Sequence, residues 1–573
     1  MVASRYLQLC LAILAVSGAK GFAPSGFGPL TSTRGGFQSR PSAAAVTQLH
    51  WGSKWFGRKQ GNGNGGDPVR FIAMDSGEEK DATDVYASKM NSDETNGNDL
   101  YIDATATKVK KEKPEFKEKT DYDVIVVGGG CSGVGTALML TRTFGLDSKR
   151  VLVVEQGKQI GESFRRWPDE MRFISPSFNQ QGWTESFDLN AIHYDTSPAF
   201  MLRSEHPTGE EYAIYLEAIA TQGDLNVSLE TKVLSIQDAG KKENGYPGPF
   251  QVQTCKDDVT EEISTRYIVW AAGEFMHPKD QEISKAKKSN SNSSSSSNND
   301  NDNAPPMSFP GADLCMHNSK VDSWAKLEGD DYIVIGGYES GIDAAVNLAR
   351  AGKKCKVLAS TPCWNIKTGD PSSELAPYTS DRLRSVLAHD FSPSPKLFSP
   401  LRVIAVDDLG NGEFGVAAKW KETDDNAPPS TYTSNGFRAE VPGDEDSVKV
   451  FRTKNPPILC TGFEGSVAAQ ASHLFAFPDP NAASKGCVGD GPLLRKNDES
   501  TVVDGVFLVG PSVSHGDLSF CFVYKFRQRF AVVANAICEG LGMDTDAAVN
   551  ECRKTNMYLD NFLTCEDTCG DAC

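Results

Sequence analysis

Short apolar runs, several of them next to glycine, interrupt an otherwise polar chain. Residues 122–127 read YDVIVV, and residues 150–157 read RVLVVEQG, whose predicted strand ends in Glu155. Short runs rich in β-branched residues are typical of parallel strands that are buried on both faces. Between them, residues 136–144 read TALMLTRTF, which has the apolar spacing of a helix. The pattern predicts a strand, a glycine turn, a helix and a second strand.

The same pattern returns at residue 332. Residues 332–360 read YIVIGGYESGIDAAVNLARAGKKCKVLAS, which predicts strand, glycine turn, helix and strand in that order. Alternating strands and helices form a parallel sheet that is covered by helices. We therefore expect an α/β fold with two Rossmann-like dinucleotide-binding domains.

The first glycine turn has the residues that a dinucleotide pyrophosphate requires. Gly128, Gly130 and Gly133 fit the pattern G-x-G-x-x-G between the predicted strand and helix. The first glycine permits the tight turn, the second lets the backbone approach the phosphates, and the third lets helix and strand pack closely. Ser132 lies in the same turn. Glu155 ends the second strand, where a carboxylate can accept hydrogen bonds from ribose hydroxyls.

The second glycine turn departs from this pattern. The turn itself is made of Gly336, Gly337, Ser340 and Gly341. Tyr338 stands where the second glycine is expected, and its side chain would crowd a pyrophosphate. No acidic residue follows the next strand, which leaves the choice between NADH and NADPH open. The alternative is a Rossmann-like unit that has lost its ligand.

Charge divides the chain into a basic leader and an acidic body. The 573 residues carry a net charge of −18, yet residues 1–66 hold seven basic residues and no acidic one. The rest of the chain therefore carries −25. An acidic body argues against nucleic acid and anionic membrane surfaces as non-specific partners.

The leader has the composition of a targeting segment. Residues 7–16 read LQLCLAILAV, a run that suits the core of a signal peptide and is too short to span a membrane. The following acid-free segment is rich in Ser, Gly and Arg, and with AKGFAPS at residues 19–25 it resembles the bipartite leaders of complex algal plastids. We expect a plastid protein, with the secretory pathway or ER lumen as the alternative, and no membrane span in the mature protein.

Four further segments resemble the flavoproteins that have two dinucleotide-binding domains. Residues 271–278 (AAGEFMHP) and 458–463 (ILCTGF) are similar to the family's two connecting segments. Residues 229–236 (LETKVLSI) and 505–511 (GVFLVGP) are similar to two of its FAD-binding strands. The resemblance implies FAD on the first unit and NAD(P)H on the second, with the NAD(P) domain inserted into a split FAD domain.

The resemblance also implies particular cofactor contacts. Val233 would meet the adenine through its backbone, and Gly273 and Gly510 would lie against the FAD. The last FAD-binding strand normally ends in Gly-Asp, whereas here it ends in Gly510–Pro511. The acidic contact to the cofactor is therefore missing from its usual position.

A narrower likeness is to bacterial NAD(P)/FAD-dependent oxidoreductases related to bacillithiol-disulfide reductase and, more distantly, to thioredoxin reductase. The segments that carry it are RWPDEMRFISPSF (166–178), FPGADLCMH (309–317), DPSSELAPYTSDRL (370–383), CFVYKFRQRFAV (521–532) and NMYLDNF (556–562). Flavin-containing monooxygenases are more distant, because Phe309, Gly311 and His317 do not have the spacing of their F-x-G-x-x-x-H signature.

These patterns together predict the domain organisation. The expected parts are a leader (1–66), a disordered linker (67–120), the first part of the FAD domain (121–325, with a disordered insert at about 285–306), the NAD(P) domain (326–450), the second part of the FAD domain (451–540), and a C-terminal helix with a cysteine-rich tail (541–573).

The cysteines favour thiol chemistry without a local redox pair. The chain has 14 cysteines but no C-x-x-C. Cys565, Cys569 and Cys573 could form a thiol arm that exchanges electrons with an external disulfide. Alternatively, they bind a metal with Cys552 as the fourth ligand, or they are inert. We predict the thiol arm and no metal.

Two further groups are candidates for chemistry near the flavin. His515 precedes a predicted helix whose N-terminus would face the flavin, so it is a candidate proton donor. Trp167, Arg172 and Ser175 follow the Glu155 strand, where related proteins surround the flavin ring.

The resemblance implies an FAD-dependent oxidoreductase that passes hydride from NAD(P)H through the flavin to an acceptor. The leading acceptor is a disulfide or another thiol-linked substrate, either a small molecule or a protein. One alternative is a flavin-dependent monooxygenase of a small molecule. Another is a non-catalytic flavin-binding redox sensor that docks a partner. A homodimer is a candidate assembly.

Overall fold

The computed structural model describes residues 71–72, 79–80, 119–178, 188–238, 247–279, 309–364, 374–388, 393–420, 448–478, 491–516 and 518–562. The chain forms two compact units, residues 1–107 and 108–573. In the first, strands β1 (Phe71–Ile72) and β2 (Glu79–Lys80) pair antiparallel. The predicted leader and the insert at about 285–306 lie outside the described residues. All other elements belong to the second unit.

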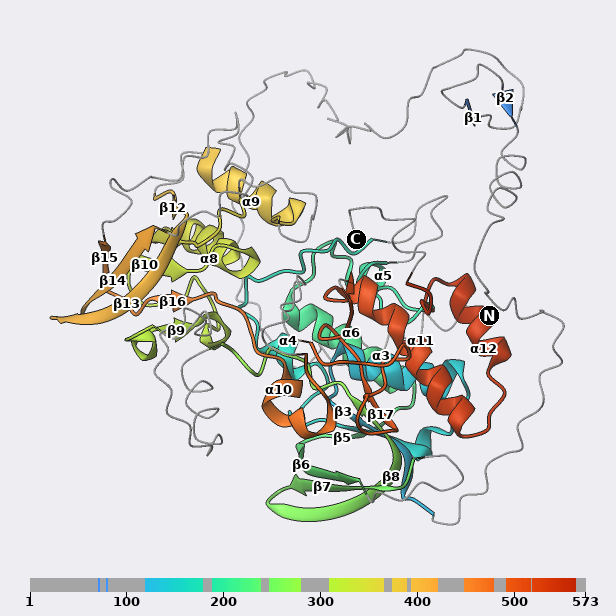
Figure 1. The fold of residues 1–573 in the computed structure, drawn as a ribbon. Helices are drawn as coiled ribbons and strands as arrows, with labels where there is room; N and C mark the ends of the chain where they lie inside the picture. The colour runs from blue at the N-terminus through green and yellow to red at the C-terminus, as the bar shows by residue number, and fades with distance from the viewer. Residues whose placement is uncertain are drawn as a thin grey trace, which may run out of the picture. The chain divides into compact units, whose positions relative to one another are not determined.

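A seven-stranded sheet forms the larger part of the second unit (Figure 1). Its parallel strands are β3 (Tyr122–Val127), β4 (Val151–Val154), β5 (Asn226–Ser228), the second half of β8 (Val259–Trp270) and β17 (Val506–Leu508). The first half of β8 continues antiparallel into β7 (Phe250–Lys256) and β6 (Thr231–Asp238). The strand predicted at residues 122–127 is confirmed, and the strand predicted within RVLVVEQG ends at Val154, one residue before Glu155.

Helices pack on this sheet because its central strands are apolar on both faces. Helix α3 (Cys131–Leu138) begins directly after the first glycine turn and packs against α11 (Val523–Gly540). Gly135 makes this possible, because a Cβ there would lie 2.3 Å from the Phe530 ring. The other helices of this part are α4 (Glu162–Arg165), α5 (Pro198–Leu202), α6 (Gly209–Gln222) and α12 (Asp546–Lys554).

A second sheet has five parallel strands in the order β12 (Lys396–Phe398), β11 (Lys354–Leu358), β10 (Asp331–Ile335), β16 (Ile458–Leu459) and β9 (Met316–His317). Alternate residues of β10 belong to different cores, as strand geometry requires. Tyr332 and Val334 pack in the core with α8 (Glu339–Arg350) and α9 (Pro377–Ala388). Ile333 and Ile335 pack in the core with a three-stranded antiparallel sheet of β13 (Leu401–Gly410), β14 (Glu413–Trp420) and β15 (Lys449–Thr453).

Two connecting segments run side by side between the sheets. One follows β8, and the other follows β16 and leads to α10 (Ser466–Gln470). The Lys279 amide donates to the Gly462 carbonyl at 3.0 Å, and the Glu464 amide donates to the His277 carbonyl at 2.7 Å. In the sequence, strands β3–β8 of the first sheet precede the strands of the second sheet, and strand β17 of the first sheet follows them.

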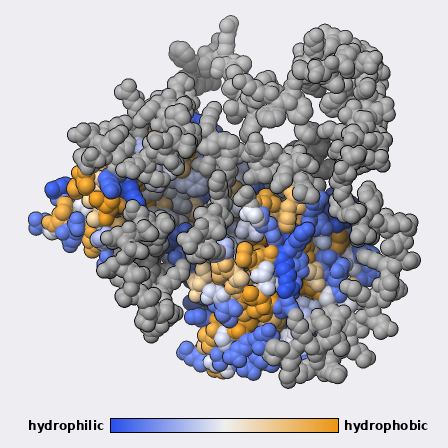
Figure 2. Space-filling view, viewed as in Figure 1, coloured by the Kyte–Doolittle hydropathy of each residue, from blue (hydrophilic) through white to orange (hydrophobic). Residues whose placement is uncertain are grey.

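The exposed apolar residues of the described chain are spread over several elements. Figure 2 shows hydrophobic and hydrophilic side chains next to one another on the described part of this face. Singly exposed residues such as Leu234 and Val450 are ordinary on protein surfaces. Within the described residues, no helix combines the length and the apolar character needed to cross a membrane.

Candidate functional site

The first glycine turn brings strand β3, helix α3 and the end of β8 into direct contact. Gly128 has a φ of +111°, and a Cβ there would lie 2.5 Å from the carbonyl oxygen of Ala271. A Cβ on Gly133 would lie 1.9 Å from the carbonyl oxygen of Gly128. Both positions therefore exclude any larger residue for reasons of packing.

Gly130 is open toward a ligand, in contrast to its neighbours. A Cβ on Gly130 would meet no atom within 4 Å. Gly130 is also the N-cap of α3, and no side chain caps the first turn of this helix. Amide groups at the start of a helix, together with its dipole, form a binding site for phosphate. The turn thus fits the pyrophosphate of FAD.

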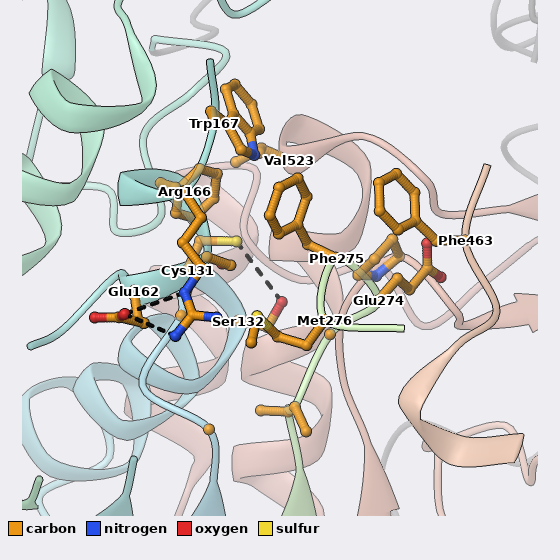
Figure 3. A pocket seen from close by; sticks show the side chains of 18 of the residues that line it. Cys131, Ser132, Glu162, Arg166, Trp167, Glu274, Phe275, Met276, Phe463 and Val523 are labelled. Carbon is orange, nitrogen blue, oxygen red and sulfur yellow. Dashed lines mark hydrogen bonds and ion pairs between the residues drawn. The ribbon is translucent and has the colours of Figure 1, made fainter. Parts of the chain in front are cut away.

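A cavity of about 660 Å³ opens from this turn (Figure 3). Seven of the predicted cofactor residues line it: Gly128, Gly130, Ser132, Glu155, Val233, Gly273 and Ser340. The other predicted cofactor residues shape the turns and strand ends without being among the lining residues: Gly133, Gly336, Gly337, Gly341 and Gly510. The cavity volume is in the range of sites for cofactors and drug-sized ligands.

Glu155 is fixed at the end of β4 by two backbone amides. Its carboxylate oxygens accept hydrogen bonds from Gly129 at 2.7 Å and from Gly157 at 2.6 Å. Burial raises the pKa of Glu155, and these two amides offset part of the increase. The carboxylate is held in the lining of the cavity, and its contact with a ribose stays a prediction.

Aromatic rings form part of the cavity lining and pack on one another behind it. Trp167 packs on Phe173 with ring centroids 5.1 Å apart, and Phe173 packs on Tyr212 at 4.3 Å. In the connecting segments, the rings of Phe275 and Phe463 stack at 5.3 Å. Trp167 and the other two predicted flavin contacts, Arg172 and Ser175, all line the cavity. Flat apolar walls of this kind suit an isoalloxazine ring.

The second glycine turn repeats the packing of the first. Gly336 has a φ of +109°, and its Cβ would lie 2.2 Å from the Cys460 carbonyl oxygen. A Cβ on Gly341 would lie 2.0 Å from the Gly336 carbonyl oxygen. Tyr338 is the N-cap of α8, and its backbone angles (φ −95°, ψ −160°) are close to those of Gly130 (φ −82°, ψ −169°). The tyrosine side chain therefore begins where the first turn is open.

The start of α8 faces the same cavity as the first turn. Glu339, Ser340 and Asp343 are among the lining residues. Burial raises the pKa of both acids. Glu339 accepts hydrogen bonds from the Thr379 hydroxyl and the Ala376 amide, and Asp343 pairs with Arg382 at 2.5 Å. The first glycine turn and the start of α8 thus line one space.

Two cysteines line this space. Burial raises the pKa of Cys131 to about 11, so its thiol stays protonated at neutral pH. Cys521 lines the cavity immediately before the N-terminus of α11. The predicted thiol arm, Cys565, Cys569 and Cys573, lies outside the described residues. Across the described part of the chain, no group of three metal-ligating side chains occurs.

His515 lies in a buried network that is separate from the lining residues. Its Nε2 lies 2.6 Å from the Asp498 carboxylate, which also pairs with Arg529 at 2.8 Å. The His515 ring stacks on Phe562 at 4.5 Å. Arg527 instead donates to backbone carbonyls, including that of Ala191 at 2.9 Å. A proton-donor role for His515 stays a prediction.

Several residues line the cavity although no sequence pattern had indicated them as candidates. Asn190 and Asn318 are buried in the cavity wall, and the Oδ1 of each has no hydrogen-bond partner among the described residues. A buried unpaired acceptor of this kind suits an N–H or O–H group of a ligand. Glu274 also lines the cavity. Its position directly after the A-A-G segment could have marked it.

The family is shown by comparison with known proteins. Residues 125–304 and 300–412 match the family described as pyridine nucleotide-disulphide oxidoreductase. The matched residues make up just over half of the chain. The chain therefore belongs to this family.

Solved structures are similar to this chain at low sequence identity. The FAD-bound cadaverine monooxygenase DfoA from Erwinia amylovora is 14% identical, with a TM-score of 0.50 over 74% of this chain and 95% of that chain. Bacillithiol disulfide reductase Bdr (YpdA) from Staphylococcus aureus is 17% identical, with a TM-score of 0.49 over 74% and 99%. The ornithine N-hydroxylase KtzI from Kutzneria sp. 744 is 12% identical, with a TM-score of 0.49 over 73% and 99%.

Family and site together define the class of protein. It is an enzyme, a flavin-dependent oxidoreductase of mixed α/β fold with parallel sheets, and its cofactors are FAD and NAD(P)H. The open turn at Gly130 and the aromatic walls fit these cofactors.

Proposed function

We propose that the enzyme reduces a disulfide or another thiol-linked acceptor, either a small molecule or a protein, at the expense of NAD(P)H. The observation that carries this proposal is that Gly130, Ser340, Cys131 and Cys521 all line one cavity. Both dinucleotide motifs and two thiols thus face the same space. For a disulfide, NAD(P)H and one proton would yield NAD(P)⁺ and two thiols.

The proposal assigns distinct roles to the chain's own residues. When bound, FAD supplies two-electron chemistry between the nicotinamide and the acceptor. The FAD domain would comprise residues 121–325 and 451–540, with the uncapped start of α3 holding the pyrophosphate. The NAD(P) domain would comprise residues 326–450. The rings of Trp167 and Phe463 would exclude water from the reacting groups.

Cys521 is the better placed of the two cysteines to meet an acceptor. Cys131 is held as a thiol by burial, and a thiol is a poor nucleophile. Cys521 lines the cavity in the segment directly before α11, outside the phosphate-binding turn that contains Cys131. We therefore propose that the Cys521 sulfur attacks the acceptor disulfide and releases one thiol, and that the C-terminal thiol arm assists in delivery. The mixed disulfide left on Cys521 would release the second thiol when it takes up two electrons, which FAD would supply when bound, and two protons.

The test is anaerobic and uses the full chain. NAD(P)H should bleach the bound flavin, and a small disulfide such as 5,5′-dithiobis(2-nitrobenzoate) should restore its colour. Cys521→Ser should abolish the second step and leave the first intact, and Cys255→Ser on β7 is the matched control. Replacement of all three tail cysteines by serine tests the arm separately. Full disulfide turnover by Cys521→Ser would overturn the role of Cys521, whereas a wild-type flavin that stays reduced in the presence of the disulfide would overturn the thiol acceptor.

Monooxygenation is the second candidate, and the aromatic walls favour it. An apolar, water-poor site protects a reactive oxygen adduct from hydrolysis. In this case, disulfides should leave the reduced flavin unchanged. Oxygen and NAD(P)H should then be consumed in equal amounts with an oxygenated product.

We also propose that residues 1–66 direct the protein to a plastid, because they are basic, acid-free and begin with a short apolar run. A fluorescent protein that carries these residues should enter the plastid of an alga with complex plastids. Accumulation in the ER lumen would support the alternative destination.

A further inference from the structure

Glu274 presents a carboxyl group to the cavity from the connecting segment after β8. It follows Gly273 directly, and both residues line the cavity. Figure 3 shows Glu274 together with Phe275 and Phe463, on the opposite side of the view from Arg166. The Ser512 hydroxyl donates a hydrogen bond to Oε1 of Glu274 at 2.7 Å. The carboxyl group is therefore held in place by a residue of the segment that follows β17.

This contact ties Glu274 to the phosphate-binding turn. Ser512 comes two residues after Gly510, in the segment that follows β17 (Val506–Leu508). Gly510 packs against the start of α3, because a Cβ there would lie 2.8 Å from the Ser132 hydroxyl oxygen. Pro511, between them, lines the cavity. The Glu274 carboxyl group thus lies within a short chain of contacts from the open turn at Gly130.

At this location, the Glu274 carboxyl group suits a ligand group that carries hydroxyls. FAD continues from its pyrophosphate into the ribityl chain, which carries hydroxyl groups, and only then into the flavin ring. A carboxylate repels the pyrophosphate but accepts hydrogen bonds from hydroxyls. The other acids near the glycine turns are already engaged, Glu155 by two amides and Glu339 by an amide and a hydroxyl. For Glu274, the hydrogen bond found within the described residues occupies Oε1.

We propose that Glu274 accepts a hydrogen bond from a ribityl hydroxyl of FAD. It would supply, from the segment after β8, the acidic group that is missing at the end of β17, where Pro511 stands. The proposal concerns how the cofactor is held. It is independent of the acceptor that the enzyme reduces.

The test compares two ligands of the same site in the full chain. FAD affinity is measured by flavin fluorescence, and ADP, which lacks the ribityl and flavin groups, is measured as a competitor of FAD. Glu274→Ala should weaken FAD binding about tenfold or more, since a hydrogen bond to a charged group is lost, and should leave the ADP inhibition constant unchanged. Glu155→Ala, at the adenosine end, should weaken both. Ser512→Ala, which loses the group that orients Glu274, should weaken FAD less than Glu274→Ala does.

Two results would overturn the proposal. One is an FAD affinity of Glu274→Ala within about twofold of the wild type, too small for a lost charged hydrogen bond. The other is an equal loss of FAD and ADP binding, which would indicate general damage to the site. If Glu274→Ala does not fold, Glu274→Leu, which keeps most of the volume and has no acceptor, decides: weaker FAD binding with unchanged ADP binding supports the proposal, and unchanged FAD binding overturns it. None of these readouts depends on turnover, so failure here is distinct from failure of the acceptor proposal.

Discussion

Two glycines of the first turn are required for opposite reasons. A Cβ on Gly133 would collide with the Gly128 carbonyl oxygen, whereas a Cβ on Gly130 would enter open space. Gly133→Ala should therefore lower the free energy of unfolding by about 1–3 kcal/mol or more, measured by urea denaturation without FAD. Gly130→Ala should leave unfolding unchanged and weaken FAD binding about tenfold or more, because the methyl group takes the space of the pyrophosphate. Equal effects on unfolding would contradict this distinction.

Tyr338 is the residue at which the two turns differ most. Its backbone matches that of Gly130, so its side chain begins in the space that a nucleotide would use. Tyr338→Gly should lower the KM for NAD(P)H by about threefold or more and leave FAD affinity unchanged. Tyr338→Phe keeps the ring and serves as the control. A higher KM in Tyr338→Gly would show that the tyrosine contacts the nucleotide favourably.

Asp498 and Arg529 form a buried ion pair whose loss should be costly. Both side chains are fully buried. Asp498→Asn leaves the guanidinium without its counter-charge, so the free energy of unfolding should fall by about 3–5 kcal/mol. Arg495→Gln removes exposed pairs with Glu499 and Asp504 and should cost less than about 1 kcal/mol. Similar losses in urea denaturation for the two variants would contradict the role of burial.

At the scale of elements, strand β8 connects the antiparallel part of the first sheet to its parallel part. Its first half pairs antiparallel with β7, and its second half pairs parallel with β3 and β17. Near the change, the Asp121 carboxylate accepts hydrogen bonds from the amide and hydroxyl of Ser264 at 2.8 and 2.7 Å. This contact connects the start of the folded body to the middle of β8.

The contact between Asp121 and Ser264 should make stability depend on pH. The Ser264 amide is the main group that lowers the pKa of Asp121 below its ordinary value of 3.8. A lowered pKa in the folded state gives stability that is present above the ordinary value and is lost as the pH falls through the folded value. Asp121→Ala should therefore lower the thermal midpoint at pH 7 and differ less from the wild type near pH 3. An equal difference at both pH values would contradict this.

At the scale of the whole molecule, local sequence patterns predicted individual strands and turns. Contacts between residues far apart in the sequence determine which side chains line the cavity. Residues 122–127 gave a strand with the right bounds, because a buried parallel strand is an unbroken apolar run. The packing roles of Gly128 and Gly133 also followed from local spacing. The bond between Glu274 and Ser512 joins residues that are far apart in the sequence, and no spacing rule relates them. For the same reason, nothing in the sequence indicated that Asn190 lines the cavity.

The paired connecting segments have a consequence for how this chain can change. The backbone leaves the first sheet after β8 and returns to it next to the same segment. There the Ser466 amide donates a hydrogen bond to the Gly273 carbonyl at 3.1 Å. The two ends of the segment between β8 and α10 are thus in contact. The entropy cost of closing this segment grows only with the logarithm of its number of residues, so a change in its length alters the cost little. The second sheet could thus lengthen, shrink or be exchanged for a related unit while the strands of the first sheet keep their register. Exchange of the segment between β8 and α10 among relatives is a route by which one flavin domain could acquire different electron donors or acceptors.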